Sequence, residues 1–117
     1  MKNVKPSENI KDGIAKLIAA SIEDYNEFCD NKNMQEEFAN SWSVKEGQKF
    51  IKVCAKHSVH SFIVKKAFKH FKEGDVLMAN GWRAPALNVA RGNLYDGYHV
   101  NTRRVAGPDY TSSNRTL

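Results

Sequence analysis

The sequence has few residues of the types that define metal-binding and membrane proteins. It contains two cysteines, no Cys-x-x-Cys pair and no cluster of cysteine with histidine. We therefore expect reduced thiols, no metal and no structural zinc, which needs about four such ligands. Apolar stretches such as residues 17–20 are only a few residues long, whereas a transmembrane helix needs about 20. No apolar segment follows the basic residues 1–6, so we also expect no secretion signal.

Familiar catalytic motifs are missing as well. The sequence contains neither a Gly-x-x-x-x-Gly-Lys phosphate loop nor a Gly-x-Ser-x-Gly elbow. His57 and His60 have no carboxylate or cysteine at ligand spacing. Asp75 and Asp96 lie beside glycine in segments typical of turns. We therefore expect a protein without catalytic activity and without a cofactor.

Charge is distributed unevenly along the chain. Residues 1–47 carry six lysines and nine acids, a net charge of −3, whereas residues 48–117 carry seven lysines, five arginines and four acids, a net charge of +8. A basic region of this strength favours a phosphate-bearing partner, although such charge also serves solubility alone. We expect a single domain with an acidic helical part over 1–47, a basic β-rich part over 48–110 and a flexible tail over 111–117.

The first 47 residues have helical periodicity. A helix over residues 7–29 with Ser7 as its N-cap is predicted by apolar residues at steps of three and four, namely Ile10, Ile14, Leu17, Ile18, Tyr25 and Phe28. A second short helix is predicted after the turn cluster at 30–33. Asn33 would cap it, and Glu36 would complete a capping box.

From residue 49 the period changes to two. This alternation predicts a strand over residues 49–56. The β-branched and aromatic residues that follow predict its partner over 59–65, a third strand is predicted over 75–79 after the turn at 72–75, and Asp-Gly at 96–97 predicts a hairpin. Proline at 85 and glycine at 92 favour a short helix over 85–91. The expected fold class is therefore α+β, with N-terminal helices packed on a small antiparallel sheet, open or barrel-like, and one short inserted helix.

Residues 81–93 concentrate the side chains that suit a phosphate-rich ligand. Arginine offers a planar fork to phosphate, and tryptophan can stack on a base. Arg83 and Arg91, eight residues apart, could converge on one ligand. The alternative is structural: Trp82 as core, Asn93 as a turn residue and Arg91 at a helix end. The candidate ligand-binding residues are Lys52, Lys65, Lys66, Trp82, Arg83, Arg91, Asn93, Arg103 and Arg104.

Over residues 38–110 the sequence resembles a family of small tailed-bacteriophage proteins of largely unknown function. The matching pieces are Val-Lys-Glu-Gly-Gln-Lys-Phe-Ile-Lys-Val at 44–53, Ser-Val-His-Ser-Phe-Ile-Val at 58–64, Phe-Lys-Glu-Gly-Asp-Val-Leu at 71–77, Gly81 to Asn93, and Gly-Pro-Asp-Tyr at 107–110. The resemblance implies a phage origin and a compact β-containing domain, and it supplies no catalytic residue. Where the family has a tryptophan before the final Gly-Pro, this chain has Asn-Thr-Arg-Arg at 101–104.

Three functions fit these observations. The first is a phage accessory protein in the host cytoplasm whose basic half binds nucleic acid. The second is a protein that binds a host or phage enzyme, or a host defence system, and inhibits or redirects it. The third is a pocket that sequesters a nucleotide signal, with the arginines lining a closed cavity. The oligomeric state is left open by the sequence.

Overall fold

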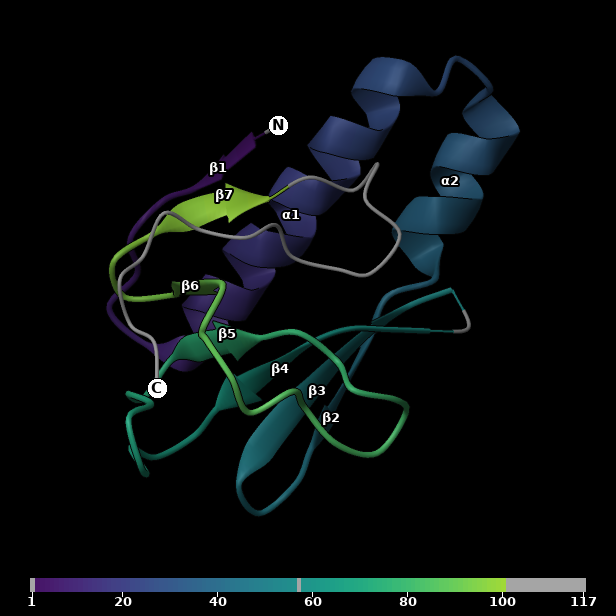
Figure 1. Cartoon of the computed structure of the whole chain (residues 1–117). Coiled ribbons are helices and arrows are strands. Elements are labelled where there is room, and N and C mark those ends of the chain that lie inside the picture. The colour runs from purple at the N-terminus through teal and green to yellow at the C-terminus, as the bar shows by residue number, and fades with distance from the viewer. Residues whose placement is uncertain (1, 57, 101–117) are drawn as a thin grey trace.

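The computed structural model describes residues 2–56 and 58–100 (Figure 1). The predicted tail at 111–117 and the candidate residues Arg103 and Arg104 lie outside these ranges. The helices are α1, Ile10–Phe28, and α2, Lys32–Asn40. The strands are β1, Lys2–Val4; β2, Ser43–Glu46; β3, Phe50–Ala55; β4, Ser58–Val64; β5, Asp75–Leu77; β6, Gly92–Asn93; and β7, Tyr98–Val100.

The main sheet is antiparallel and open. Its strand order is β2-β3-β4-β5-β6, with β2 and β6 at the edges in the described part of the chain. A second, two-stranded sheet pairs β1 with β7, so the two ends of the described chain lie side by side (Figure 1). The α+β class with N-terminal helices is therefore confirmed, and the sheet is open rather than a closed barrel.

Both helices begin at caps other than the predicted ones. The side chain of Asn9 accepts a hydrogen bond from the backbone N–H of Asp12 at 2.8 Å and caps α1. Asn31 caps α2 in the same way, through the N–H of Met34 at 3.1 Å. Ser7 is buried, and its backbone N–H donates to the carbonyl of Leu94 at 3.1 Å. The chain therefore reaches α1 through a contact with the β6–β7 connection.

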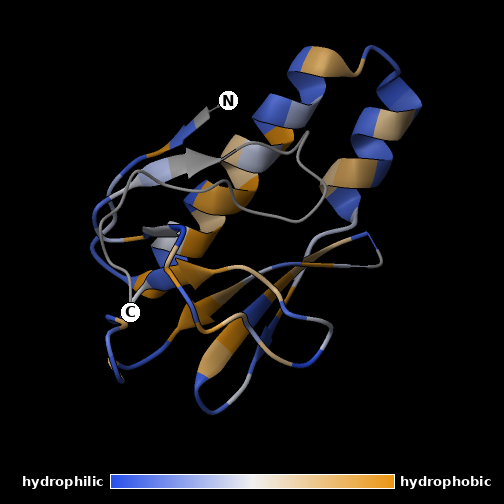
Figure 2. Ribbon diagram, viewed as in Figure 1, coloured by the Kyte–Doolittle hydropathy of each residue, from blue (hydrophilic) through white to orange (hydrophobic). Residues whose placement is uncertain are grey.

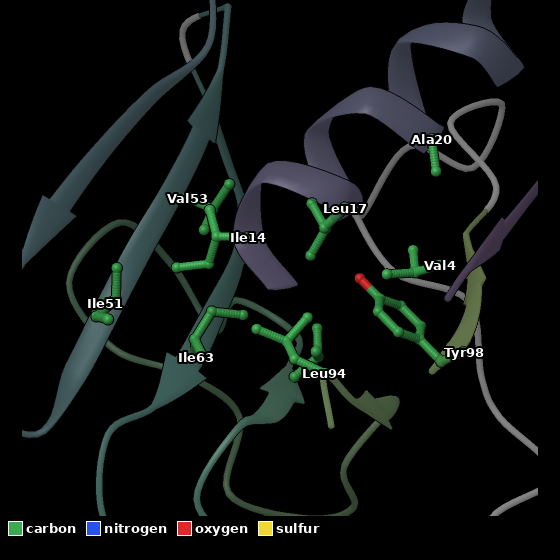
Figure 3. Close-up of a cluster of buried hydrophobic side chains, with 10 residues drawn as sticks. Val4, Ile14, Leu17, Ala20, Ile51, Val53, Ile63, Leu94 and Tyr98 are labelled. Carbon is green, nitrogen blue, oxygen red and sulfur yellow. The ribbon is translucent and has the colours of Figure 1, made fainter. Parts of the chain in front are cut away.

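The two faces of the main sheet have different coverings. One face packs against α1, and the apolar side chains of the helix and strands meet there (Figure 3). This cluster consists of Val4, Ile14, Leu17, Ala20, Ile51, Val53, Ile63, Val76, Leu94 and Tyr98. Hydrophobic residues colour much of α1 and of the strands that it covers (Figure 2). The other face carries a smaller cluster, made of Phe62, Val64, Phe71, Leu77 and Ala90. Both faces are apolar at the end of β4, which explains why Phe62, Ile63 and Val64 are apolar in succession and all buried.

The predicted helix over residues 85–91 is wrong. Residues 78–86 instead form a hairpin-like arm, in which Ala79 and Pro85 form an antiparallel bridge. The N–H of Ala86 donates to the carbonyl of Met78, and the N–H of Asn80 to that of Ala84, each at 2.8 Å. A seven-residue segment is too short to hold a helix by itself. Its two ends are held instead by longer-range hydrogen bonds, that of Ala86 to Met78 and that of the Arg91 N–H to the carbonyl of Val76 at 2.7 Å.

The Asp-Gly signal predicted a turn correctly and its partners incorrectly. Gly97 has a φ of +82° and donates its N–H to the carbonyl of Asn93 at 2.9 Å. The flanking strands then pair elsewhere: β6 with β5, and β7 with β1. The strands β1 and β2 were not predicted, because segments of three and four residues show little periodicity.

Candidate functional site

A row of facing residues crosses the sheet on the side away from α1. Lys45 on β2 lies opposite Lys52 on β3, Lys52 opposite Phe62 on β4, and Phe62 opposite Leu77 on β5. Directly opposed residues share a face of the sheet, and like charges placed in this way disfavour folding. The row therefore runs from apolar residues on β5 and β4 to one lysine on β3 and one on the edge strand β2.

The arm places a tryptophan against these lysines. The ring centroid of Trp82 lies 4.4 Å from Nζ of Lys52 and 5.7 Å from Nζ of Lys45, within range of cation–π attraction. The indole is 49% exposed, so it is not the core residue that the structural alternative proposed. Gly81 has a φ of +96° just before it, which glycine adopts without steric cost.

A groove of about 330 Å³ opens beside this contact. Its cations are Lys45, Lys49, Lys52 and Arg83, and its aromatic side chains are Phe50 and Phe62. The β2–β3 turn, the middle of β4 and the tip of the arm therefore contribute to one surface. We call this surface the basic groove. Four cations line it against one carboxylate, that of Glu46.

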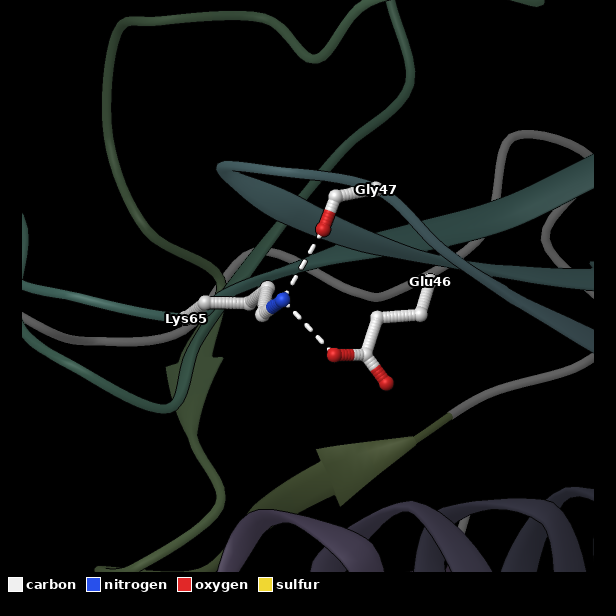
Figure 4. Close-up of polar contacts among 3 residues, drawn as sticks. All are labelled: Glu46, Gly47 and Lys65. Atoms are coloured by element: carbon white, nitrogen blue, oxygen red, sulfur yellow. Dashed lines mark hydrogen bonds and ion pairs between the residues drawn. The ribbon is translucent and has the colours of Figure 1, made fainter.

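The carboxylate of Glu46 is held by Lys65 (Figure 4). Nζ of Lys65 lies 2.7 Å from Oε2 of Glu46 and donates to the carbonyl of Gly47 at 2.9 Å. These contacts join the end of β4 to the turn that follows β2. Lys65 is thus placed to support the groove and to neutralise its carboxylate. Lys66 is exposed beyond the groove lining.

Arg91 and Asn93 lie in the interior, at 2% and 4% exposure. Nη2 of Arg91 is 3.0 Å from Sδ of Met78. Asn93 donates to Oδ1 of Asp75 at 2.8 Å and accepts from the N–H of Tyr95 at 2.8 Å, so it holds the turn after β6. Neither residue lines the basic groove, and Arg83 and Arg91 do not converge on it.

Two tyrosines that could have stacked on a base are engaged elsewhere. Burial holds the pKa of the Tyr98 hydroxyl far above its usual value. The Tyr95 hydroxyl donates to the carboxylate of Glu73, and this hydrogen bond raises its pKa, with burial adding to the effect. The exposed aromatic ring beside the cations is therefore that of Trp82.

The structure brings three predicted residues together, Lys52, Trp82 and Arg83, and adds two lysines that sequence reasoning missed. Lys45 was missed because β2 was not predicted. A usable signal was present: Ser-Val-Lys-Glu, then Gly-Gln, then Lys-Phe-Ile-Lys-Val, which reads as two alternating segments around a turn. Lys49 lies just after that turn.

Residues 2–56 and 58–100 contain no group of three or more His, Cys, Asp or Glu side chains that could hold a metal ion. Within the same ranges, neither helix combines the length and apolar character that a membrane span requires.

The chain belongs to a family of unknown function, DUF7717, whose match covers residues 2–111. The family match therefore spans the helices, both sheets and the arm, and it assigns neither a phage origin nor an activity. Searches of curated proteins and of solved structures found no match.

Proposed function

We propose that this member of the family is a non-catalytic accessory protein of tailed bacteriophages that acts in the host cytoplasm and binds nucleic acid through the basic groove. The observation that carries the proposal is the convergence of Lys45, Lys49, Lys52 and Arg83 beside aromatic side chains. Cations of this kind neutralise phosphates and release counterions, which supplies most of the affinity in binding without sequence preference. The resemblance of residues 38–110 to tailed-phage proteins supports the phage origin.

The arrangement of the two facing lysines, Lys45 and Lys52, favours an anionic ligand. Lys45 and Lys52 oppose each other directly across β2 and β3. Such a pair disfavours the folded state unless other interactions offset the repulsion. The Trp82 ring offsets part of it through cation–π contact. A phosphate bound between the two ammonium groups would offset the rest, so the pair is more useful to a ligand site than to the fold.

Sequestration of a nucleotide signal has less support. That function called for arginines around a closed cavity. Arg83 lines an open groove at the tip of the arm, whereas Arg91 is buried beside Met78. The cations that do converge are mostly lysines, which bind phosphate as point charges and without the planar recognition that arginine provides.

A second candidate function is docking onto a host or phage protein through β2. All four residues of this edge strand are exposed, and Val44 is 46% exposed. In the described part of the chain, no strand pairs with the outer side of β2. A free edge can accept a strand from another protein. A stoichiometric host protein that co-purifies after nuclease treatment, and is lost in Val44→Glu, would favour this function.

The test of nucleic-acid binding compares two double variants that lose the same charge. Lys45→Ala/Lys52→Ala removes the facing lysines, whereas Lys11→Ala/Lys32→Ala removes exposed lysines from the two helices. Affinity for a fluorescein-labelled oligonucleotide is measured by anisotropy between about 50 and 200 mM salt. We expect the groove variant to bind more weakly and its salt slope to shrink by about 2, one for each phosphate contact.

The control variant should keep a salt slope close to that of the unmodified protein. Equal losses in both variants would show that net charge, not the groove, attracts the oligonucleotide. An absence of binding at about 50 mM salt would contradict the proposal as a whole.

A further inference from the structure

The arm that carries Trp82 is held by its own backbone hydrogen bonds and has an exposed tip. Its base is closed by the hydrogen bond from Ala86 to Met78 and its tip by the hydrogen bond from Asn80 to Ala84. Gly81 has a φ of +96°, and apart from its own chain neighbours no atom lies within 4 Å of the place a Cβ would occupy. Such closure limits the positions available to Trp82, so an exposed indole is held over the sheet at little further entropic cost on binding.

Trp82 also borders a second hollow, of about 270 Å³. The residues lining this hollow are Ser58, Val59, Ala79, Gly81 and Trp82, and none of them carries a charge. The basic groove reaches the same ring through Lys52, whose Nζ is 4.4 Å from the ring centroid. The indole therefore connects a cationic hollow to an uncharged one.

This arrangement matches the two chemical parts of a nucleotide. The phosphate is an anion and suits the basic groove. The base is flat and mostly uncharged, and it can stack on an indole face. Each hollow is at or below the lower end of the volumes typical of small-ligand sites, so each fits one such part and not a whole helix.

We propose that the basic groove and the Trp82 hollow together bind single-stranded nucleic acid, with a base stacked on Trp82 and its phosphates on Lys45, Lys52 and Arg83. This inference rests on the proposed function and restricts its ligand. In a duplex the faces of the bases are covered by their neighbours, and unstacking one base has a cost of a few kcal/mol. A single strand presents those faces freely.

The experiment uses three labelled probes of equal phosphate count: a 15-mer of thymidine, a blunt duplex hairpin, and a 15-mer of abasic sugar phosphate. Affinities are measured by anisotropy at about 50 mM salt. We expect the thymidine 15-mer to bind about tenfold more tightly than the abasic one, which is 1.4 kcal/mol, and the duplex to resemble the abasic probe. Oligouridine is titrated in parallel, and base-dependent binding of either polymer supports the proposal.

Variants of Trp82 separate stacking from charge. Trp82→Leu should lower thymidine binding to the abasic level and leave abasic binding unchanged, and Trp82→Tyr should restore most of the difference. A thermal melt of each variant serves as the control for folding. In Trp42→Phe, where Trp82 is the remaining tryptophan, thymidine should quench the fluorescence and the abasic probe should not.

The outcomes distinguish this inference from the function on which it rests. Equal affinity for all three probes would overturn the base site and leave phosphate binding in the groove intact. Tighter binding of the duplex would overturn it as well. If none of the probes binds, the proposed function itself fails.

Discussion

The two faces of the main sheet receive alternate residues of the same strands, yet one is a buried core under α1 and the other carries the basic groove. On one face Ile51 and Val53 meet α1 and are buried. On the other, Phe50 from the same strand packs against Phe62 and Phe68, and Lys52 lies against Trp82 of the arm, which covers the sheet only in part. The 19-residue helix α1 buries the β3 and β4 side chains on its face, whereas the nine-residue arm leaves Trp82 about half exposed, and β2 is exposed on both faces. The difference in covering element separates a core from a binding surface.

Truncating a side chain in the helix face should have the largest effect. Leu17 is fully buried between α1 and the sheet. Leu17→Ala should lower the free energy of unfolding by about 2–5 kcal/mol, because it removes apolar contacts and leaves a cavity. Urea denaturation measures the change, with the exposed Ala15→Gly as a control for helix propensity, expected at about 1 kcal/mol.

A loss of less than about 1 kcal/mol for Leu17→Ala would mean that the face collapses around the gap. The difference between the two faces would then be smaller than the packing indicates. Oligonucleotide affinity of the folded variant should be unchanged, since Leu17 does not line the basic groove.

The stability of the protein should depend on pH because His60 is buried near Trp42. His60 is buried, with its ring centroid 5.2 Å from that of Trp42, and lies where the β3–β4 register shifts between Val53 and Cys54. Burial lowers its pKa to about 4. The unfolded chain takes up this proton near pH 6.5, and the folded chain does so only near its own lower pKa.

Stability should therefore be highest above about pH 7 and fall as the pH drops toward 4. The contribution of His60 to this fall is about 3 kcal/mol, from 1.36 kcal/mol for each pH unit. Denaturation at a series of pH values measures it, and His60→Phe serves as the comparison because it cannot titrate. Parallel pH profiles for the two proteins would show that His60 is not the cause.

The ion pair beside the groove should have the smallest effect on stability. Lys65 and Glu46 are 26% and 67% exposed, and exposed pairs contribute about 0–1 kcal/mol. Lys65→Ala should therefore melt almost normally. It should weaken oligonucleotide binding all the same, because the Glu46 carboxylate is no longer neutralised at the groove.

The double variant Lys65→Ala/Glu46→Gln is the matched control for Lys65→Ala and should recover most of the affinity. If it binds as weakly as the single variant, Lys65 itself contacts the ligand. Destabilisation by more than about 1 kcal/mol in the single variant would instead make the pair part of the fold.

Local signals in the sequence were strong enough to predict α1, β3, β4 and the α+β class. The helical stripe ends in Tyr25 and Phe28, β3 begins with alternating residues, and β4 is rich in β-branched and aromatic residues. The caps were shifted because the turn before each helix offers several polar side chains. Asn9 and Ser7 are both good caps, and the contact of Ser7 with Leu94 decided between them.

The candidate site was predicted only in part, because tertiary contacts again decided between residues of equally suitable type. Composition identified Lys52, Trp82 and Arg83 as suited to phosphate and base. It also selected Arg91 and Asn93, whose residue types are equally suited but whose side chains lie in the interior. Residue type states what a side chain can bind, and burial decides whether a ligand can reach it.

By itself the sequence determined the N-terminal helices, the strands β3 and β4 and the excess of positive charge after residue 47. These features depend on residues near one another in the chain. Only the tertiary structure decided that Lys45 faces Lys52 and that Trp82 lies over both. Strand register and the closure of the arm depend on hydrogen bonds between distant backbone groups. Shifting the register by one residue would move each lysine to the opposite face.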